Sequence, residues 1–282
     1  MTAGGGSPRF AMMSTATSLR NSIALHGALF FLAQGALLLG VTLGYGMPWG
    51  HCALFLGICA AYHGLLTGFL VARREDFHIE GTGVPLSRVN LSNTLTFGRL
   101  SSIPTIVFLI VQASYPILPV MLPLVCIVFA TDWLDGIVAR RRGEITFVGR
   151  YLDSSSDYLM IIAVSIMFYY FALIPLWFFI LTICRLVLFA MGMALLALKE
   201  GKADPLSTFL GKASIFALMV LYVMEIARRF GVPWIGHEIV VQIMEYAVAI
   251  VVVISLVDKA IFLRRKFSKA AQRRAGTPPT AG

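Results

Sequence analysis

Eight long apolar runs dominate this chain of 282 residues. They lie at 22–46, 50–72, 93–114, 119–140, 151–173, 175–198, 208–229 and 236–263. A helix needs roughly 20 apolar residues to cross about 30 Å of hydrocarbon. With 58% hydrophobic and 13% charged residues, the composition is that of a membrane protein and excludes an ordinary soluble domain. The sequence therefore predicts an all-α integral membrane protein with about eight transmembrane helices.

A polar stretch at 73–92, RREDFHIEGTGVPLSRVNLS, is the sharpest break in composition along the chain. Charged residues, glycine and proline replace the apolar runs there, which is typical of a connection. We expect a two-helix N-terminal membrane segment at 22–72, a cytoplasmic linker at 73–92 and a six-helix bundle at 93–263. The tails at 1–21 and 264–282 bury little apolar surface and are expected to be disordered.

Lysine and arginine are distributed unequally between the two sets of connections. Most of the 23 cations fall in alternate connections counted from the N-terminus, whereas 47–49, 115–118, 174 and 230–235 hold almost none. Because short positive loops stay cytoplasmic, both termini are predicted to be cytoplasmic, in a multi-pass protein of the bacterial inner membrane. Topology and attraction to anionic membrane lipids explain the net charge of +9, so no nucleic-acid partner is needed.

Four aspartates lie at the end of one predicted span and the start of the next. Asp132 and Asp135 are spaced i, i+3, and Asp153 and Asp157 are spaced i, i+4, so each pair occupies one helix face. The short segment RRRGEITFVG between the pairs predicts a cytoplasmic turn, which places both pairs near the same membrane surface. Four carboxylates so close together repel one another unless cations lie among them.

Oxygen ligands without histidine or thiolate favour Mg²⁺, Mn²⁺ or Ca²⁺ over zinc. Two such ions can bridge the phosphates of a substrate and stabilise attacking and leaving oxygens. Gly136 and Ala139 share the helix face of the first acidic pair, and their small size allows a phosphate to approach the backbone. The neighbouring Arg140 can pair with phosphate in bidentate fashion. This combination predicts phosphoryl-transfer chemistry.

Each part of this pattern, taken alone, also occurs in membrane proteins that are not enzymes. Acidic residues at span ends often only face water, and small residues often only permit helix packing. Intramembrane carboxylates also mark ion paths, which would make the protein an ion-coupled transporter. A transporter site is expected near the bilayer midplane, however, and these acids cluster at one surface. A structural or assembly protein would have no use for the acidic motif.

The aspartate pattern resembles the signature of the CDP-alcohol phosphotransferases, D-x2-D-G-x2-A-R-x8-G-x3-D-x3-D. Every spacing is kept by Asp132, Asp135, Gly136, Ala139, Arg140, Gly149, Asp153 and Asp157. Upstream, NTLTFGRLSSIP is similar to the family's N-x-L-T-x-x-R-x4-P stretch through Asn93, Leu95, Thr96, Arg99 and Pro104. The resemblance covers about 90–263 and leaves out the first two spans.

The resemblance implies a homodimeric enzyme of phospholipid biosynthesis. Its six-helix bundle would transfer a phosphatidyl or similar group from a CDP-linked lipid donor to an alcohol acceptor and release CMP, with two Mg²⁺ or Mn²⁺ ions. Asp132, Asp135 and Asp153 would be metal ligands, and Asp157 would be both a ligand and the general base. Residues expected to bind the CDP group are Gly136, Ala139, Arg140, Asn93 and Thr96.

The acceptor is left open by these motifs. Phosphatidylglycerophosphate synthases of the family typically show D-P-x-A-D-K at the second acidic pair, whereas this chain has DSSSDY. Arg185 and Lys212 are candidates for binding an acceptor phosphate. Alternatively, Arg185 pairs with an acidic residue such as Glu225 or Glu245. A transferase of the CDP-choline or CDP-ethanolamine type, with diacylglycerol as acceptor, is a further alternative within the family.

Overall fold

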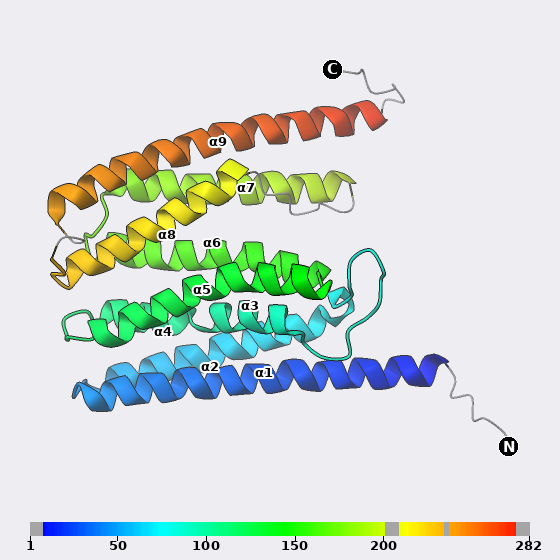
Figure 1. Cartoon of the computed structure of the whole chain (residues 1–282), viewed down its shortest axis with the longest axis horizontal. Coiled ribbons are helices and arrows are strands. Elements are labelled where there is room, and N and C mark those ends of the chain that lie inside the picture. The colour runs from blue at the N-terminus through cyan, green and yellow to red at the C-terminus, as the bar shows by residue number, and fades with distance from the viewer. Residues whose placement is uncertain (1–7, 201–208, 234–236, 275–282) are drawn as a thin grey trace. The chain divides into compact units, whose positions relative to one another are not determined.

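The computed structural model describes residues 8–200, 209–233 and 237–274, and these ranges are built from helices joined by turns and, at 77–90, by a longer irregular connection (Figure 1). The elements in chain order are α1 (Pro8–Gly44), α2 (Trp49–Ala72), the 3₁₀ helix η1 (Arg74–Asp76), α3 (Leu91–Ser101), α4 (Ile103–Val111), α5 (Leu118–Arg142), α6 (Phe147–Tyr170), α7 (Leu176–Glu200), α8 (Phe209–Arg229) and α9 (Glu238–Arg274). The predicted all-α class is confirmed.

Six stretches of the described chain are long and apolar enough to cross a membrane. They are Ala16–Gly44, Trp49–Ala72, Leu91–Val111, Leu118–Arg142, Phe209–Arg229 and Glu238–Ser268. Helices α3 and α4 together form one of them. The predicted number of eight is therefore approximate, because α6 carries charged residues in its first turns and α7 contributes a shorter apolar stretch, Leu176–Gly192.

The chain divides into two compact units, the first ending at Met160 and the second beginning at Ile161. This division falls within α6 and differs from the boundary expected at 73–92. Part of that connection packs on the turn between α5 and α6. The Glu80 amide donates to the Ile145 carbonyl at 2.8 Å, and Arg150 donates from Nε to the Glu80 carboxylate at 2.8 Å. These bonds tie the polar connection to the first unit.

Both terminal helices extend into segments that were expected to be disordered tails. Helix α1 begins at Pro8, and α9 continues to Arg274, so residues 8–21 and 264–274 are helical. The sequence RRKFSKAAQRR at the end of α9 is rich in arginine, lysine, alanine and glutamine, which favour helix even where little surface is buried. The remaining tail residues, 1–7 and 275–282, lie outside the described residues.

Helix α3 lies at the core of the first unit. Asn90 caps its start by accepting a hydrogen bond from the Asn93 amide at 3.0 Å, and the new helix α4, with Pro104 in its first turn, begins after a break at Ser102. Helix α2 contacts α3 through the Tyr62 hydroxyl, which donates to the Leu100 carbonyl at 3.0 Å. Helix α1 also packs against α3. The two N-terminal helices therefore support the helix that carries Arg99.

In the second unit, α9 packs against both α7 and α8. Buried polar side chains join these helices. The Ser214 hydroxyl of α8 hydrogen-bonds to the Ser255 hydroxyl of α9 at 3.0 Å, and Tyr222 hydrogen-bonds to Ser165 at the α6 end of the unit. Apolar side chains such as Phe168 and Leu218 fill the space around these bonds.

Candidate active site

The structure brings the four aspartates together at one end of α5 and α6. One carboxylate oxygen from each of Asp132, Asp153 and Asp157 lies within 4.8 Å of the others. Asp135 is more deeply placed, with 4% of its surface exposed, whereas the side chain of Asp153 is 45% exposed. The cluster therefore has a buried side and a side that a ligand can reach.

A short turn places the two acidic pairs at the same level. Helix α5 ends at Arg142 and is followed by Gly143, whose φ of +64° is a left-handed conformation that favours glycine. Thr146 then caps α6, because its hydroxyl accepts a hydrogen bond from the Gly149 amide at 3.0 Å. A side chain at Gly149 would bring its Cβ within 2.6 Å of Asn93 Oδ1 and 2.7 Å of the Thr146 hydroxyl. The motif glycine thus allows α6 to start close against α3.

The guanidinium of Arg99, from α3, lies among all four carboxylates. It forms an ion pair with Asp132, and its Nη2 lies 2.7 Å from Asp153 Oδ1 and 3.4 Å from Asp135 Oδ2. The remaining carboxylate, of Asp157, is 3.9 Å from Nη1. Arg99 itself is 2% exposed. The predicted set of site residues did not include Arg99, although two signals were available: its match to the family's upstream stretch and its place inside an apolar run.

The contacts of Arg99 test whether the cluster fits a metal. Four carboxylates converge on one buried positive charge, so the site is built to surround a cation. The converging donors are all carboxylate oxygens, which suits Mg²⁺ or Mn²⁺. These residues therefore fit the divalent ions that the motif implies.

Two residues expected to bind the CDP group are buried and form hydrogen bonds that hold neighbouring parts of the site in place. The Thr96 hydroxyl donates to Asp135 Oδ2 at 2.8 Å, and Asn93 Oδ1 accepts from the Thr146 hydroxyl at 3.1 Å. The Ser92 hydroxyl also holds α5, by donating to the Asp135 carbonyl at 2.9 Å. Contact of Asn93 and Thr96 with CDP stays a prediction.

The remaining motif residues form an accessible basic edge beside the carboxylates. A Cβ added at Gly136 would lie 3.1 Å from Arg140 Nη1, so the guanidinium of Arg140 lies over the glycine. Arg140 is exposed, and Ala139 is half-buried on the same helix. An anionic group could reach Arg140 and the bare backbone at Gly136 together. Their binding of the CDP group stays a prediction.

The two cations predicted to bind the acceptor belong to the second unit. Arg185 on α7 is 1% exposed and donates from Nη2 to the Gly211 carbonyl at 3.0 Å and to the Ser214 hydroxyl. Lys212 is exposed in the first turn of α8. Glu225, suggested as a structural partner of Arg185, forms an ion pair with Arg228 at 2.7 Å. The role of Arg185 and Lys212 in acceptor binding stays a prediction.

Fold and site together define a helical membrane protein with an acidic centre suited to phosphate chemistry. The family model for CDP-alcohol phosphatidyltransferase matches residues 89–259. The chain therefore belongs to the CDP-alcohol phosphatidyltransferase family. It is an enzyme of phospholipid biosynthesis, in a family that generally depends on divalent metal.

Several curated proteins are similar to this chain. A cardiolipin synthase (CMP-forming) of Streptomyces coelicolor is 30% identical over 167 residues, which cover 56% of this chain and 74% of the relative. The CDP-diacylglycerol–glycerol-3-phosphate 3-phosphatidyltransferase of Bacillus subtilis is 31% identical, over 34% of this chain and 56% of the relative. No solved structure gives a significant match.

Proposed function

We propose that this enzyme transfers the phosphatidyl group of CDP-diacylglycerol to a hydroxyl of phosphatidylglycerol and releases CMP. The observation that carries the proposal is the convergence of four motif carboxylates at one end of α5 and α6. The choice of acceptor is supported by the similarity to a CMP-forming cardiolipin synthase over 74% of its length. The product would then be cardiolipin.

The carboxylates of Asp132, Asp135, Asp153 and Asp157 would hold one or two Mg²⁺ or Mn²⁺ ions. When bound, such ions neutralise the diphosphate of the donor and the charge that develops during transfer. The ions would take over the charge interactions that Arg99 makes in the structure. Thr96 keeps Asp135 in place through its hydrogen bond to Oδ2.

The protein's own residues would orient the two substrates. Arg140 would pair with the diphosphate, while Gly136 and Ala139 leave room for the donor against α5. Asp157 would accept the proton of the acceptor hydroxyl. The hydroxyl oxygen then bonds to the phosphorus that carries diacylglycerol, and the bond from that phosphorus to the bridging oxygen breaks. CMP departs with the electron pair of that bond.

Glycerol 3-phosphate is the second candidate acceptor, since the relative from Bacillus subtilis is named for that substrate. The stretch DSSSDY argues against it, because this segment lacks the proline and the basic residue typical of the glycerophosphate enzymes. If Arg185 and Lys212 bind an acceptor phosphate, Arg185→Gln should raise the acceptor KM about tenfold or more, as for a lost charge-assisted hydrogen bond. If Arg185→Gln instead has a lower melting temperature and an unchanged acceptor KM, Arg185 has a structural role in the helix bundle and does not bind the acceptor.

The acceptor is tested with purified protein, labelled CDP-diacylglycerol and Mg²⁺. Phosphatidylglycerol, glycerol 3-phosphate, inositol, serine and diacylglycerol are supplied separately, and the lipid product and CMP are quantified. We expect cardiolipin and CMP in equal amounts with phosphatidylglycerol. A lipid product formed from glycerol 3-phosphate and none from phosphatidylglycerol would overturn the choice of acceptor and leave the transferase chemistry intact.

We also propose a homodimer with its active site and both termini in the cytoplasm. The excess of lysine and arginine in alternate connections supports this orientation. Reporters fused after Arg74, Arg150 and the C-terminus should indicate the cytoplasm, and reporters near Met47 and Pro116 the opposite side. A cytoplasmic signal at Pro116 would contradict the orientation, and a monomeric mass in light scattering would contradict the dimer.

A further inference from the structure

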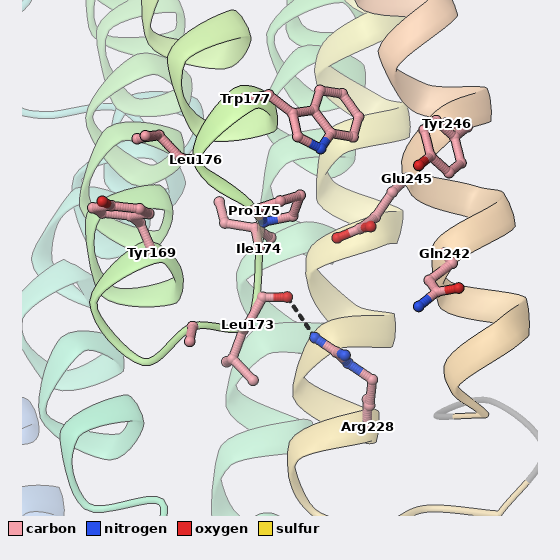
Figure 2. A pocket seen from close by; sticks show the side chains of 11 residues that line it. Tyr169, Leu173, Ile174, Pro175, Leu176, Trp177, Arg228, Gln242, Glu245 and Tyr246 are labelled. Carbon is pink, nitrogen blue, oxygen red and sulfur yellow. Dashed lines mark hydrogen bonds between the residues drawn. The ribbon is translucent and has the colours of Figure 1, made fainter.

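A pocket of about 530 Å³ lies in the second unit, and its lining includes none of the residues assigned to catalysis. Figure 2 shows it between the turn that joins α6 to α7, the last turns of α8 and the first turns of α9. Its volume is in the range of small-molecule sites. Its lining includes Trp177, Arg228, Gln242, Glu245 and Tyr246.

The carboxyl group of Glu245 points into this pocket (Figure 2). Glu245 is 7% exposed. Within the described ranges, no lysine, arginine or histidine forms an ion pair with Glu245, and its side chain hydrogen-bonds to that of Glu225. Two carboxyl groups in hydrogen-bond contact share a proton, because two carboxylates side by side would repel each other. A cationic ligand beside Glu245 could take the place of that proton.

The arginine in the pocket lining forms its direct ion pair with Glu225 and not with Glu245. Arg228 donates from Nε to Glu225 Oε2 at 2.9 Å and from Nη2 to the carbonyl of Leu173. The same guanidinium forms an ion pair with Glu225, whose side chain is fully buried. One arginine therefore faces two carboxylates, and its charge is matched by Glu225. Once the shared proton is displaced, Glu245 can balance a cationic ligand, so the pocket favours a cation over an anion.

Aromatic side chains beside Glu245 indicate which cation fits. The rings of Trp177 and Tyr246 are stacked, with centroids 5.6 Å apart and planes 13° apart, and form an apolar wall of the pocket. Mg²⁺ and Ca²⁺ require about six or more oxygen ligands, whereas the side chains of the lining offer mainly those of Glu245 and Gln242. An organic ammonium needs fewer polar partners, and its methylene groups can lie against aromatic rings.

We propose that this pocket binds the ammonium group of an amine-bearing phospholipid, with Glu245 as counterion and Trp177 against the headgroup methylenes. Trp177 and Tyr246 are 42% and 63% exposed and lie within the first three turns of α7 and α9, near the helix ends at which aromatic residues commonly anchor membrane proteins among lipid headgroups. A soluble amine would offer the same ammonium chemistry. The binding experiment therefore includes both sources.

The experiment uses the full chain in detergent with Trp177 as its single tryptophan, after Trp49→Phe, Trp133→Phe and Trp234→Phe. Its fluorescence is followed during titration with phosphatidylethanolamine, N-acetylated phosphatidylethanolamine, phosphatidylglycerol or glycerophosphoethanolamine. We expect a saturable change with phosphatidylethanolamine, and no saturable change with the N-acetylated lipid or phosphatidylglycerol. An equal response to glycerophosphoethanolamine would assign the site to soluble amines and overturn the lipid assignment.

Glu245→Gln should weaken phosphatidylethanolamine binding by about tenfold or more, the usual effect of losing a charge-assisted interaction. Glu238→Gln, at an exposed position at the start of the same helix, is the matched control and should bind as before. An unchanged affinity in Glu245→Gln would overturn the proposal. If Glu245→Gln does not fold, the comparison of the two lipids on protein that keeps Glu245 tests the proposal. Equal binding of phosphatidylethanolamine and its N-acetylated form would exclude a role for the ammonium charge and overturn the proposal.

Discussion

Replacing Arg99 with glutamine should destabilise the metal-free protein far more than the metal-loaded protein. The side chain of Arg99 is 1% exposed and is the cation at the centre of four carboxylates. Removing it leaves negative charges that repel one another. Divalent ions bound to the same carboxylates would supply the missing charge, so the loss should shrink when Mg²⁺ is present.

The size of the effect follows from burial. Removing one partner of a fully buried ion pair costs about 3–5 kcal/mol. Water screens part of this charge, because the side chains of Asp132 and Asp153 are 34% and 45% exposed, whereas those of Asp135 and Asp157 are 6% and 16% exposed. We therefore expect Arg99→Gln to lower the free energy of unfolding by about 2–4 kcal/mol in EDTA. Saturating Mg²⁺ should restore at least half of it.

Unfolding by SDS in mixed micelles, followed by circular dichroism with EDTA or with Mg²⁺, measures this difference. Arg150→Gln is the control, since its side chain is 42% exposed and its ion pair with Glu80 lies outside the cluster. An exposed pair contributes about 0–1 kcal/mol, and its loss should not depend on metal. An equal loss of stability for Arg99→Gln in EDTA and in Mg²⁺ would refute the claim that divalent ions and Arg99 neutralise the same carboxylates.

Two further predictions concern the support of the acidic centre. Gly149→Ala should destabilise the protein by about 1–3 kcal/mol, as overpacking does, because the added Cβ meets Asn93 Oδ1 at 2.6 Å. Gly57→Ala is the control, since Gly57 has open space around it, and this variant should be neutral or stabilising in the same unfolding assay. Equal effects of the two glycine variants would contradict the close approach of α6. Thr96→Val removes the hydrogen bond to Asp135 and should cost about 1 kcal/mol, together with weaker Mn²⁺ binding measured by electron paramagnetic resonance. Unchanged Mn²⁺ affinity would remove Thr96 from the support of the metal ligands.

The acidic cluster could be predicted from sequence because helical spacing alone fixes its local geometry. Asp132 and Asp135 share a face of α5, Asp153 and Asp157 share a face of α6, and a short turn leaves the pairs little freedom. The position of Arg99 depends instead on how α3 packs across α5. The sequence shows an arginine inside an apolar run, and only tertiary structure shows that its partners are all four aspartates.

Two more features depend on contacts between residues that are distant along the chain. The polar stretch at 73–92 has the composition of a domain boundary, yet Glu80 is bonded to Ile145 and Arg150 beyond several intervening helices. Composition does not reveal such bonds. The pocket at Glu245 was also beyond prediction, because its residues come from three separate segments that meet only when α7, α8 and α9 pack together.

CMP release from CDP-diacylglycerol by wild-type protein and by Asp153→Ala tests the central claim most directly. Asp76→Ala, which removes a surface ion pair with Arg73, serves as the control for the loss of an aspartate. With Mg²⁺ and phosphatidylglycerol, the wild type and the control should form CMP and a new phospholipid in equal amounts, whereas Asp153→Ala should be folded and inactive. Normal CMP release by folded Asp153→Ala would contradict the assignment of the acidic cluster as the catalytic centre.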